Sequence, residues 1–374
     1  MPNSISINAH ASLVRNERGK RPESMGYQVV RTSVEQDKDT ILKFWRENHP
    51  KPLDAKYRWM YENNPAGKPI IWILRHTESG DCVGMVTLFP RMMTTKNGVI
   101  RVGVTGDLLV NRKHRTLGPA VKLLRSTLTA VHDGDVDLIY TFPNKAADGV
   151  AKVARYRHLG KLLRMVKVLG VTQYLHGFGV PRFLIPPLSS LIDFILKITS
   201  IETWKSNNKK VVCRETRVVD ASFSRLWDES HALFEIAGER TEDYVRWKFL
   251  HDPDDVNRIF AAFDATGGKL LAYIVYREER NNIEVREYIH GPDEAAGTTL
   301  MANFFRHART LGTASVTINL LENRRLISRM QRFGFRERGG YRNAYIHCSD
   351  RLGNACARFA EPDNWLLMAS DEDT

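Results

Sequence analysis

A motif that occurs twice constrains the fold of this chain more than any other feature. In the stretch Tyr57–Pro65, an Arg-Trp pair is followed by an aromatic residue two positions after the tryptophan and by a proline six positions after it. The stretch Tyr244–Pro253 has the same residue types at the same spacing. Each copy precedes a predicted hairpin, and the elements that follow come in the same order. The repeat therefore predicts two copies of one α/β unit.

Hydrophobic periodicity places the elements of each copy. Alternating apolar residues predict strands, and apolar residues at intervals of three and four predict helices. In the first copy the predicted strands are 27–31, 70–74, 82–88, 102–110, 136–142 and 165–174, and the predicted helices are 34–48, 55–63, one that includes 121–128 and one that ends at Leu159. In the second copy the predicted strands are 257–263, 270–276, 283–290 and 314–319, and the predicted helices are 294–311 and one that ends at Gly334.

Length and composition are those of a soluble globular protein with two domains or one large domain. The chain has 374 residues, of which 43% are hydrophobic and 26% are charged, enough for a core in each half. The polar N-terminal stretch has no apolar run behind its basic residues, so we expect no secretory signal there. The predicted divisions are a disordered leader at 1–26, a first unit at 27–176, a linker with a helix at 177–210, a second unit at 211–349 and a C-terminal tail at 350–374.

The net charge of +12 indicates a polyanionic partner without identifying it. The phosphates of a cofactor, nucleic acid and an anionic membrane surface are the competing explanations. The four cysteines lie far apart, without a Cys-x-x-Cys pair. We therefore predict no metal site, no disulfide framework and a cytoplasmic location.

The linker carries an apolar run at 188–201 that is interrupted by Asp193 and Lys197. A run of this length is too short to span a bilayer. Two interpretations are open for a helix at 183–201. It can pack against one of the domains, which is the interpretation that its length favours, or it can lie in a membrane interface.

The stretch 102–124 joins a predicted strand to a predicted helix through a basic turn. The turn ends in small residues at the helix start, where unpaired N–H groups and the positive end of the helix dipole favour an anion. Gly118 permits close approach of the backbone to a phosphate, and Arg115 adds a fixed positive charge. This stretch therefore predicts a phosphate-binding cradle.

The same stretch resembles the GNAT superfamily of acyl-CoA N-acyltransferases. That family has an acidic residue late in its fourth strand and then (R/Q)-x-x-G-x-(G/A) at the helix start, and Asp107 followed by Arg115-Thr-Leu-Gly118-Pro-Ala120 matches in residue type and spacing. Pro119 departs from the pattern in having no N–H to offer. The resemblance implies two tandem domains, each with a mixed, largely antiparallel sheet flanked by helices. It also implies coenzyme A contacts at Leu109, Val110, Arg115, Thr116, Leu117, Gly118, Ala120 and Asn144.

The resemblance further implies two catalytic residues. The family uses a carboxylate on the fourth strand as the base and a tyrosine four residues before a glycine as the acid, which here indicates Asp107 and Tyr156. Each has a structural alternative, because Asp107 can bond backbone groups at a bulge and Tyr156 can be a core residue. Lys161 stands where the family prefers phenylalanine. Asn144 lies sixteen residues before Gly160, where eleven is usual, so we expect a remodelled helix entry.

The second copy lacks the cradle. The predicted strand 283–290, which corresponds to the fourth strand of the first copy, is followed by Asp293 and Glu294, whose charges stabilise the helix start themselves and repel a pyrophosphate. A late motif is retained, in which Asn323 precedes Gly334-Phe335 by eleven residues. We therefore predict one coenzyme A site, in the first copy, and a degenerate second copy that shapes one side of the acceptor cleft. The Arg-Trp pairs occur in both copies, which favours a packing role for them.

These observations predict an N-acyltransferase, by default an N-acetyltransferase, that transfers an acyl group from acetyl-CoA or another acyl-CoA to an amine. A small molecule, an amino sugar and a peptide amine are all open as the acceptor, and we expect no nucleic-acid partner. An aminoacyl-tRNA-dependent transferase of the peptidoglycan type is the enzymatic alternative, because it has a similar doubled fold and a use for positive charge. A scaffold that binds an acyl-CoA or a partner without turnover is the non-enzymatic alternative.

Overall fold

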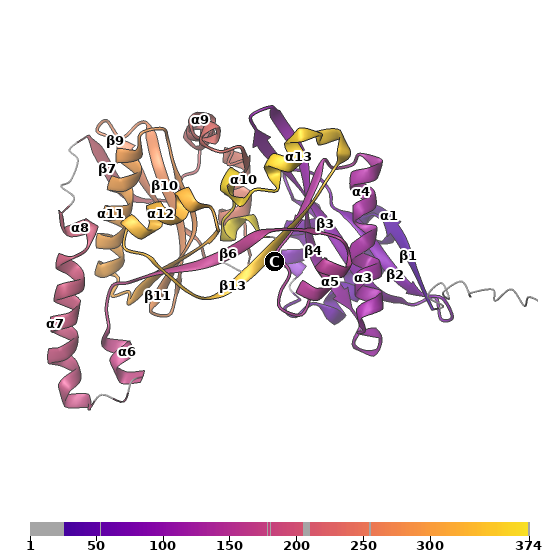
Figure 1. Ribbon diagram of the computed structural model, residues 1–374, viewed down its shortest axis with the longest axis horizontal. Coiled ribbons are helices and arrows are strands. Elements are labelled where there is room, and N and C mark those ends of the chain that lie inside the picture. The colour runs from indigo at the N-terminus through magenta and orange to yellow at the C-terminus, as the bar shows by residue number, and fades with distance from the viewer. Residues whose placement is uncertain are drawn as a thin grey trace, which may run out of the picture.

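The computed structural model of the chain describes residues 26–52, 54–177, 179, 181–204, 210–253 and 256–372. The predicted leader lies outside these residues except for Gly26. Figure 1 shows two α/β halves that are joined through one continuous sheet. Helices flank this sheet, which is mixed and mostly antiparallel, as predicted for the fold class.

The first half follows the predicted order of strands and helices up to residue 141. Its first helix spans the predicted residues, because the Ser33 side chain accepts a hydrogen bond from the N–H of Gln36 and caps the helix start. The strands are β1 (Tyr27–Thr32), β2 (Ile70–His76), β3 (Cys82–Thr95), β4 (Gly98–Val110), β5 (Leu138–Thr141) and β6 (Arg157–Val168). The helices are α1 (Val34–Asn48), α2 (Asp54–Tyr57), the π-helical turn η1 (Arg58–Glu62), the 3-10 turn η2 (Arg112–His114), α3 (Leu117–Ser126), α4 (Leu128–Asp133) and α5 (Asp148–Val153).

A helical segment connects the halves, and the second half then repeats the order of the first. The connecting elements are α6 (Thr172–Gly177), η3 (Arg182–Leu184), α7 (Ile185–Ile198) and α8 (Ile201–Trp204). The strands of the second half are β7 (Val211–Thr216), β8 (Ile236–Gly238), β9 (Arg258–Asp264), β10 (Leu270–Glu279), β11 (Asn282–His290), β12 (Ser315–Leu321), β13 (Arg336–Cys348) and β14 (Trp365–Leu366). Its helices are α9 (Ala221–Ser230), η4 (His231–Leu233), α10 (Glu242–Val245), the π-helical turn η5 (Arg246–Leu250), α11 (Glu294–Thr310), α12 (Arg324–Arg332), η6 (Asp350–Leu352), α13 (Asn354–Phe359), η7 (Pro362–Asn364) and η8 (Ala369–Asp371).

The two halves exchange strands at the centre of the sheet. The strand order is β1-β2-β3-β4-β5-β13-β6-β12-β11-β10-β9-β7. Strand β13 of the second half pairs with β5 and β6 of the first, and β6 pairs with β12 of the second half. In Figure 1 these two long strands cross the middle of the molecule side by side. Each half therefore completes the sheet of the other.

This exchange explains the main error in the predicted elements. The sequence predicted a helix that ends at Leu159 and a strand at 165–174, whereas α5 ends at Val153 and β6 begins at Arg157. Residues 157–168 form a strand because β12 and β13 lie on either side of them and pair with them. Both neighbours come from the far end of the chain, so no local pattern reveals them.

The C-terminal segment 350–372, to which the sequence analysis assigned no element, is folded into the core. Trp365 and Leu367 are fully buried, in a cluster that also contains Val102 of β4 and Leu138 of β5. Strand β14 pairs in parallel with β8, which in turn pairs with β3. The segment thus packs against both halves.

The repeated Arg-Trp motifs meet each other. The indole N–H of Trp59 donates to the carbonyl of Trp247 at 2.9 Å, and the indole N–H of Trp247 donates to the carbonyl of Trp59 at 3.1 Å. The two rings are stacked, with centroids 5.0 Å apart. Such a reciprocal contact is typical of a two-fold relation, in which the same patch is used by both partners. The predicted packing role of the motifs is confirmed.

Candidate active site

Strand β4 carries a bulge at Asp107. Met85 of β3 pairs with Leu109 and Thr87 pairs with Gly106, so one more residue is accommodated in β4 than in β3 between these pairs. Asp107 has a φ of 45°, in the left-handed region that a residue with a side chain seldom adopts. Strain of this kind persists where the surrounding structure holds it, and it is common at functional sites.

The bulge lies where β4 separates from its neighbour. Strands β4 and β5 run parallel and are paired from Val102 with Leu138 to Val104 with Tyr140. Beyond this point the described residues of the two strands are not paired. The end of β4 that contains Asp107 is therefore free of β5, and its backbone groups on that side are available to a bound molecule.

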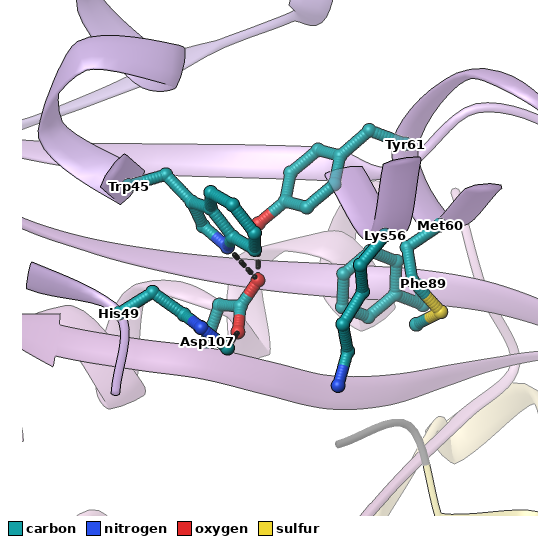
Figure 2. Close-up of a pocket in the computed structure, with 7 residues that line it drawn as sticks. All are labelled: Trp45, His49, Lys56, Met60, Tyr61, Phe89 and Asp107. Carbon is teal, nitrogen blue, oxygen red and sulfur yellow. Dashed lines mark hydrogen bonds and ion pairs between the residues drawn. The ribbon is translucent and has the colours of Figure 1, made fainter. Parts of the chain in front are cut away.

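The Asp107 side chain points to a group of aromatic donors (Figure 2). One carboxylate oxygen, Oδ2, accepts hydrogen bonds from the Trp45 indole at 2.9 Å and from the Tyr61 hydroxyl at 2.6 Å. The other oxygen, Oδ1, lies 3.6 Å from Nε2 of His49. Trp45 comes from α1, His49 follows the end of α1, and Tyr61 belongs to η1. Two hydrogen bonds to one oxygen hold the carboxylate in this orientation.

Tyr61 and His49 each place a donor atom next to the Asp107 carboxylate. Burial, followed by the nearby Asp107 charge, raises the pKa of Tyr61 well above its usual value, so this hydroxyl stays protonated and donates. The His49 Nδ1 atom accepts a hydrogen bond from the backbone N–H of Lys51 at 3.1 Å. A neutral His49 ring therefore carries its proton on Nε2, facing Asp107. The His49 ring stacks on Trp45, with centroids 4.5 Å apart.

A small pocket opens beside this group. It has about 240 Å³ of space free of protein atoms, part of it open to solvent. The Asp107 side chain, 16% exposed, contributes a carboxylate to a lining that is otherwise mainly aromatic and apolar. The lining residues are Trp45, His49, Lys56, Met60, Tyr61, Phe89 and Asp107.

The predicted cradle follows β4 after the short turn η2. Helix α3 begins at Leu117, and the Thr116 side chain makes no capping hydrogen bond to it, so the first N–H groups of the helix are free of a side-chain cap. A Cβ atom placed on Gly118 would meet nothing within 4 Å, so the space in front of this residue is open. Arg115, in the turn before α3, is exposed, and its guanidinium donates to the Val110 carbonyl at 3.3 Å. These features fit a bound phosphate.

Residues 29–160 match the family model described as Acetyltransferase (GNAT) domain. The matched range covers about a third of the chain and lies within its first half. This range includes the bulge of β4, the pocket and the start of α3. No curated protein matches the sequence.

Solved structures of named acyltransferases share the fold over most of the chain. A probable N-acyltransferase of unknown function from Enterococcus faecalis V583 gives a TM-score of 0.61 at 10% identity, covering 87% of this chain and 73% of that one. A GCN5-related N-acetyltransferase from Anabaena variabilis gives 0.60 at 10% identity, covering 87% and 74%. The N-myristoyltransferase of Saccharomyces cerevisiae with bound myristoyl-CoA gives 0.51 at 13% identity, covering 86% and 79%. At these identities the likeness establishes the fold.

Two residues from the sequence analysis lie apart from the pocket. Tyr156 is 5% exposed, in the core beneath α3, and its hydroxyl lies 2.6 Å from Oγ1 of Thr127. Burial raises the pKa of Tyr156 to about 12. The Asn144 side-chain oxygen accepts hydrogen bonds from the N–H groups of Ala146 and Ala147, both at 3.0 Å, and so shapes the loop before α5. These placements favour the structural alternative for Tyr156 and a turn-forming role for the Asn144 oxygen.

Replacing Tyr156 with phenylalanine is expected to lower the free energy of unfolding by about 1 kcal/mol and to leave turnover unchanged, because the hydroxyl bonds within the core. Urea unfolding followed by circular dichroism measures the first quantity, and steady-state rates measure the second. The matched control is Tyr341→Phe, whose side chain is 54% exposed and should alter neither. A tenfold loss of turnover at unchanged stability would instead make Tyr156 the catalytic acid.

The sequence analysis did not identify Trp45, His49 and Tyr61 as neighbours of Asp107. A signal for the first two was present, because Trp-x-Glu-x-His occurs at residues 45–49 and again at 227–231. Both copies stand at the end of the first helix of their half, α1 and α9. Spacing of four on a helix places the two rings on one face. Tyr61 lies in the repeated Arg-Trp motif that the sequence analysis identified, but the orientation of its side chain toward β4 depends on the π-helical turn.

In the second half the corresponding carboxylate is covered by other residues. Strand β11 also contains an irregularity, next to Glu287, which is fully buried. Arg240 contacts Glu287 at 3.2 Å and Asp371 at 2.8 Å, and the Ser370 hydroxyl donates to Glu287 at 2.9 Å. The C-terminal segment therefore covers the carboxylate of β11, whereas the carboxylate of β4 faces a pocket. Among the described residues, no group of three or more His, Cys, Asp or Glu side chains is arranged to hold a metal ion.

Proposed function

We propose that the chain is an acyl-CoA-dependent N-acyltransferase whose active site lies at the bulge of β4 in the GNAT domain. One observation carries the proposal. Asp107, whose backbone is strained at the bulge, places its carboxylate at the border of a pocket, and the same strand leads through a short basic turn to a helix start without a side-chain cap. The family match supports acyl transfer as the reaction class. Acetyl-CoA is the default donor, and the acceptor is an amine.

The chemistry requires one proton to leave the amine and another to reach the departing thiolate. The amine nitrogen forms a bond to the thioester carbonyl carbon and carries a second proton into the tetrahedral adduct. The carbon–sulfur bond then breaks, and this second proton passes to the departing sulfur, directly or through water, so that coenzyme A leaves as the thiol. The Asp107 carboxylate attracts an ammonium group and accepts its proton, directly or through water. Trp45 and Tyr61 orient the carboxylate as positioning residues, since each donates to Oδ2.

The residues at the start of α3 fit the phosphates of the donor. The N–H groups of Leu117 and Gly118 lie in the first turn of the helix, where the helix dipole favours an anion. Arg115 is exposed beside them, and the space before Gly118 is open. Pro119 offers no N–H, so this cradle has one donor fewer than the usual pattern.

Thermal unfolding with and without acetyl-CoA tests the proposal most directly. A ligand present at about 100 times its dissociation constant stabilises the folded state by about 2.7 kcal/mol. Larger stabilisation by a longer acyl-CoA would identify a different donor within the same proposal. No shift with any acyl-CoA would contradict it and favour the aminoacyl-tRNA-dependent alternative, which does not need the cradle.

We expect one molecule of acetyl-CoA to bind per chain, in the first half. The start of α11 carries Asp293 and Glu294, and the Asp293 side chain already caps the helix by accepting from the N–H of Ala295 at 2.8 Å. Its N-terminus is therefore both capped and negatively charged, unlike that of α3. Isothermal titration calorimetry measures the stoichiometry, and a value of two would contradict the assignment of the second half as degenerate.

Replacing Gly118 with aspartate should weaken acyl-CoA binding at least tenfold without unfolding the protein. The substitution puts a negative charge where the pyrophosphate is proposed to lie, and the open space at this position tolerates the side chain. The matched control is Gly149→Asp, because Gly149 is likewise the second residue of a helix and faces open space. Equal affinities of wild type and Gly118→Asp in calorimetry would show that the start of α3 does not bind the phosphates of the donor.

A further inference from the structure

Helix α7 presents an apolar face to solvent. Five residues of this face are spaced alternately by four and three, and the sixth, Phe194, follows Leu191 by three, which places all of them along one side of the helix. Leu191 is 59% exposed and Phe194 is 60% exposed. We call this side the α7 face, and it comprises Leu184, Leu188, Leu191, Phe194, Ile195 and Ile198. In Figure 1, α7 lies at the outer edge of the second half with α6 beside it.

The opposite side of α7 holds it to the protein. Ile185 and Ser189 are buried, and the Asp193 side chain accepts a hydrogen bond from the N–H of Val171 at 2.8 Å. The next helix, α8, is anchored by Glu202, which is 3% exposed and contacts Lys167 at 2.9 Å. The helix is therefore fixed along a narrow stripe, and its broad side stays uncovered by the described part of the chain.

The charges around the α7 face have one sign. Between residues 171 and 204 the acidic residues are Asp193 and Glu202, and both are used in the inward contacts just described. Arg182 and Lys197 are exposed on this segment. The sequence continues with Lys205, Lys209 and Lys210. Within residues 171–204, an apolar face accompanied by the exposed Arg182 and Lys197, with both acidic side chains used in inward contacts, complements an anionic lipid surface.

Aromatic side chains stand at both ends of the segment. Phe183 is 78% exposed before α7, and Trp204 is 76% exposed after α8. The indole N–H of Trp204 donates to the carbonyl of Ile198, which holds the ring near the end of α7. Aromatic residues with a polar edge favour the boundary between headgroups and acyl chains.

We propose that the α7 face binds the surface of an anionic lipid bilayer, with α7 lying in the plane of the interface. In the described residues no helix is long and apolar enough to cross a membrane, which is consistent with a peripheral mode. A second copy of the chain is a poorer occupant, because paired α7 faces would bring Arg182 and Lys197 of each copy together without exposed acids to compensate them. This inference does not depend on the proposed enzymatic function.

The protein carries its own reporter for a test. Of its seven tryptophans, the six others are at most 6% exposed, so Trp204 is the one that contact with lipid can desolvate. The experiment titrates the full chain with vesicles of phosphatidylcholine alone and with vesicles containing 30% phosphatidylglycerol, with co-sedimentation as the second readout. We expect a blue shift of tryptophan emission and co-sedimentation with the anionic vesicles, both reduced at high salt.

The Leu191→Asp/Phe194→Asp double variant should lose at least tenfold in vesicle affinity, with an unchanged circular dichroism spectrum because both residues are exposed. The matched control is Val218→Asp, at an apolar side chain that is 66% exposed outside this segment and should leave binding unchanged. Equal binding of wild type and the double variant would overturn the proposal. So would absence of binding to anionic vesicles, or a dimer in sedimentation analysis that the double variant abolishes.

Discussion

Replacing Asp107 with asparagine is expected to lower turnover about 100-fold at neutral pH, which is the scale of lost general-base assistance. Asparagine keeps an oxygen that can accept from Trp45 or Tyr61, so the substitution removes the charge and the proton acceptor with little change of shape. Acyl-CoA affinity should stay the same, because the phosphates are proposed to bind at the start of α3. Release of the coenzyme A thiol in the presence of a panel of polyamines, amino sugars and peptides measures the rate.

The control for this variant is Asp81→Asn, a carboxylate at the exposed turn between β2 and β3. It should change neither rate nor affinity. If the rate of Asp107→Asn equals that of wild type from pH 6 to pH 9, Asp107 has a structural role at the bulge. A lowered melting temperature with an unchanged rate per folded molecule would lead to the same conclusion.

Replacing Arg240 with methionine should have the largest effect on stability, a loss of about 3–5 kcal/mol in the free energy of unfolding. Arg240 is fully buried, and it contacts two carboxylates, those of Glu287 and Asp371. Its guanidinium also donates to the carbonyl of Gly238 at 2.7 Å. Without it, two acidic groups are left in the core without the positive charge that compensates them. Chemical denaturation followed by circular dichroism measures the loss.

The same variant should be less impaired at acidic pH. Burial already raises the pKa of Glu287 in the folded protein, and losing Arg240 removes a charge that opposes this rise. A carboxyl group whose folded pKa is raised favours folding while protonated, and this contribution is lost as pH increases through the folded pKa. The difference between variant and wild type should therefore be smaller at pH 5 than at pH 8. A difference that grows toward low pH would contradict this account.

Arg258→Met is the matched control for Arg240. Arg258 also contacts two carboxylates, Glu278 at 3.4 Å and Glu215 at 3.7 Å, but its side chain is 47% exposed. Exposed ion pairs contribute about 0–1 kcal/mol. A loss at Arg258 as large as that at Arg240 would show that charge number, and not burial, determines the effect.

The two halves contain the same structural elements, but the carboxylates on their irregular strands have different surroundings. Each has a first helix that leads into Trp-x-Glu-x-His, a π-helical turn that begins with Arg-Trp, and an irregular strand with a carboxylate, β4 in the first half and β11 in the second. In the first half the carboxylate of Asp107 borders a pocket. In the second half the carboxylate of Glu287 is bonded to Arg240 and covered by the C-terminal segment. This difference supports our proposal of one active site per chain.

Local sequence patterns determined much of the first half of the fold. Residues 34–48 form a helix as predicted because a serine cap and an apolar stripe act within a few residues of each other. The order of a strand, a basic turn and a helix start was likewise predictable, since β4, η2 and α3 are consecutive in the chain, and the binding of phosphate there stays a prediction. The repeated Arg-Trp motif indicated two related units, because both copies preserve the residues that pack against each other.

Contacts between residues far apart in the sequence determine the remaining features of the fold and of the candidate site. The sequence predicted a helix up to Leu159, but residues 157–168 form β6 because β12 and β13 of the second half pair with it. The same long-range packing buries Tyr156 and encloses the C-terminal segment. It also brings Trp45, Tyr61 and Asp107 together from a helix, a π-helical turn and a strand. The sequence by itself thus singled out Asp107 and the start of α3, whose proposed roles stay predictions. The donors around Asp107 and the exposure of the α7 face depend on tertiary packing, which local periodicity does not encode.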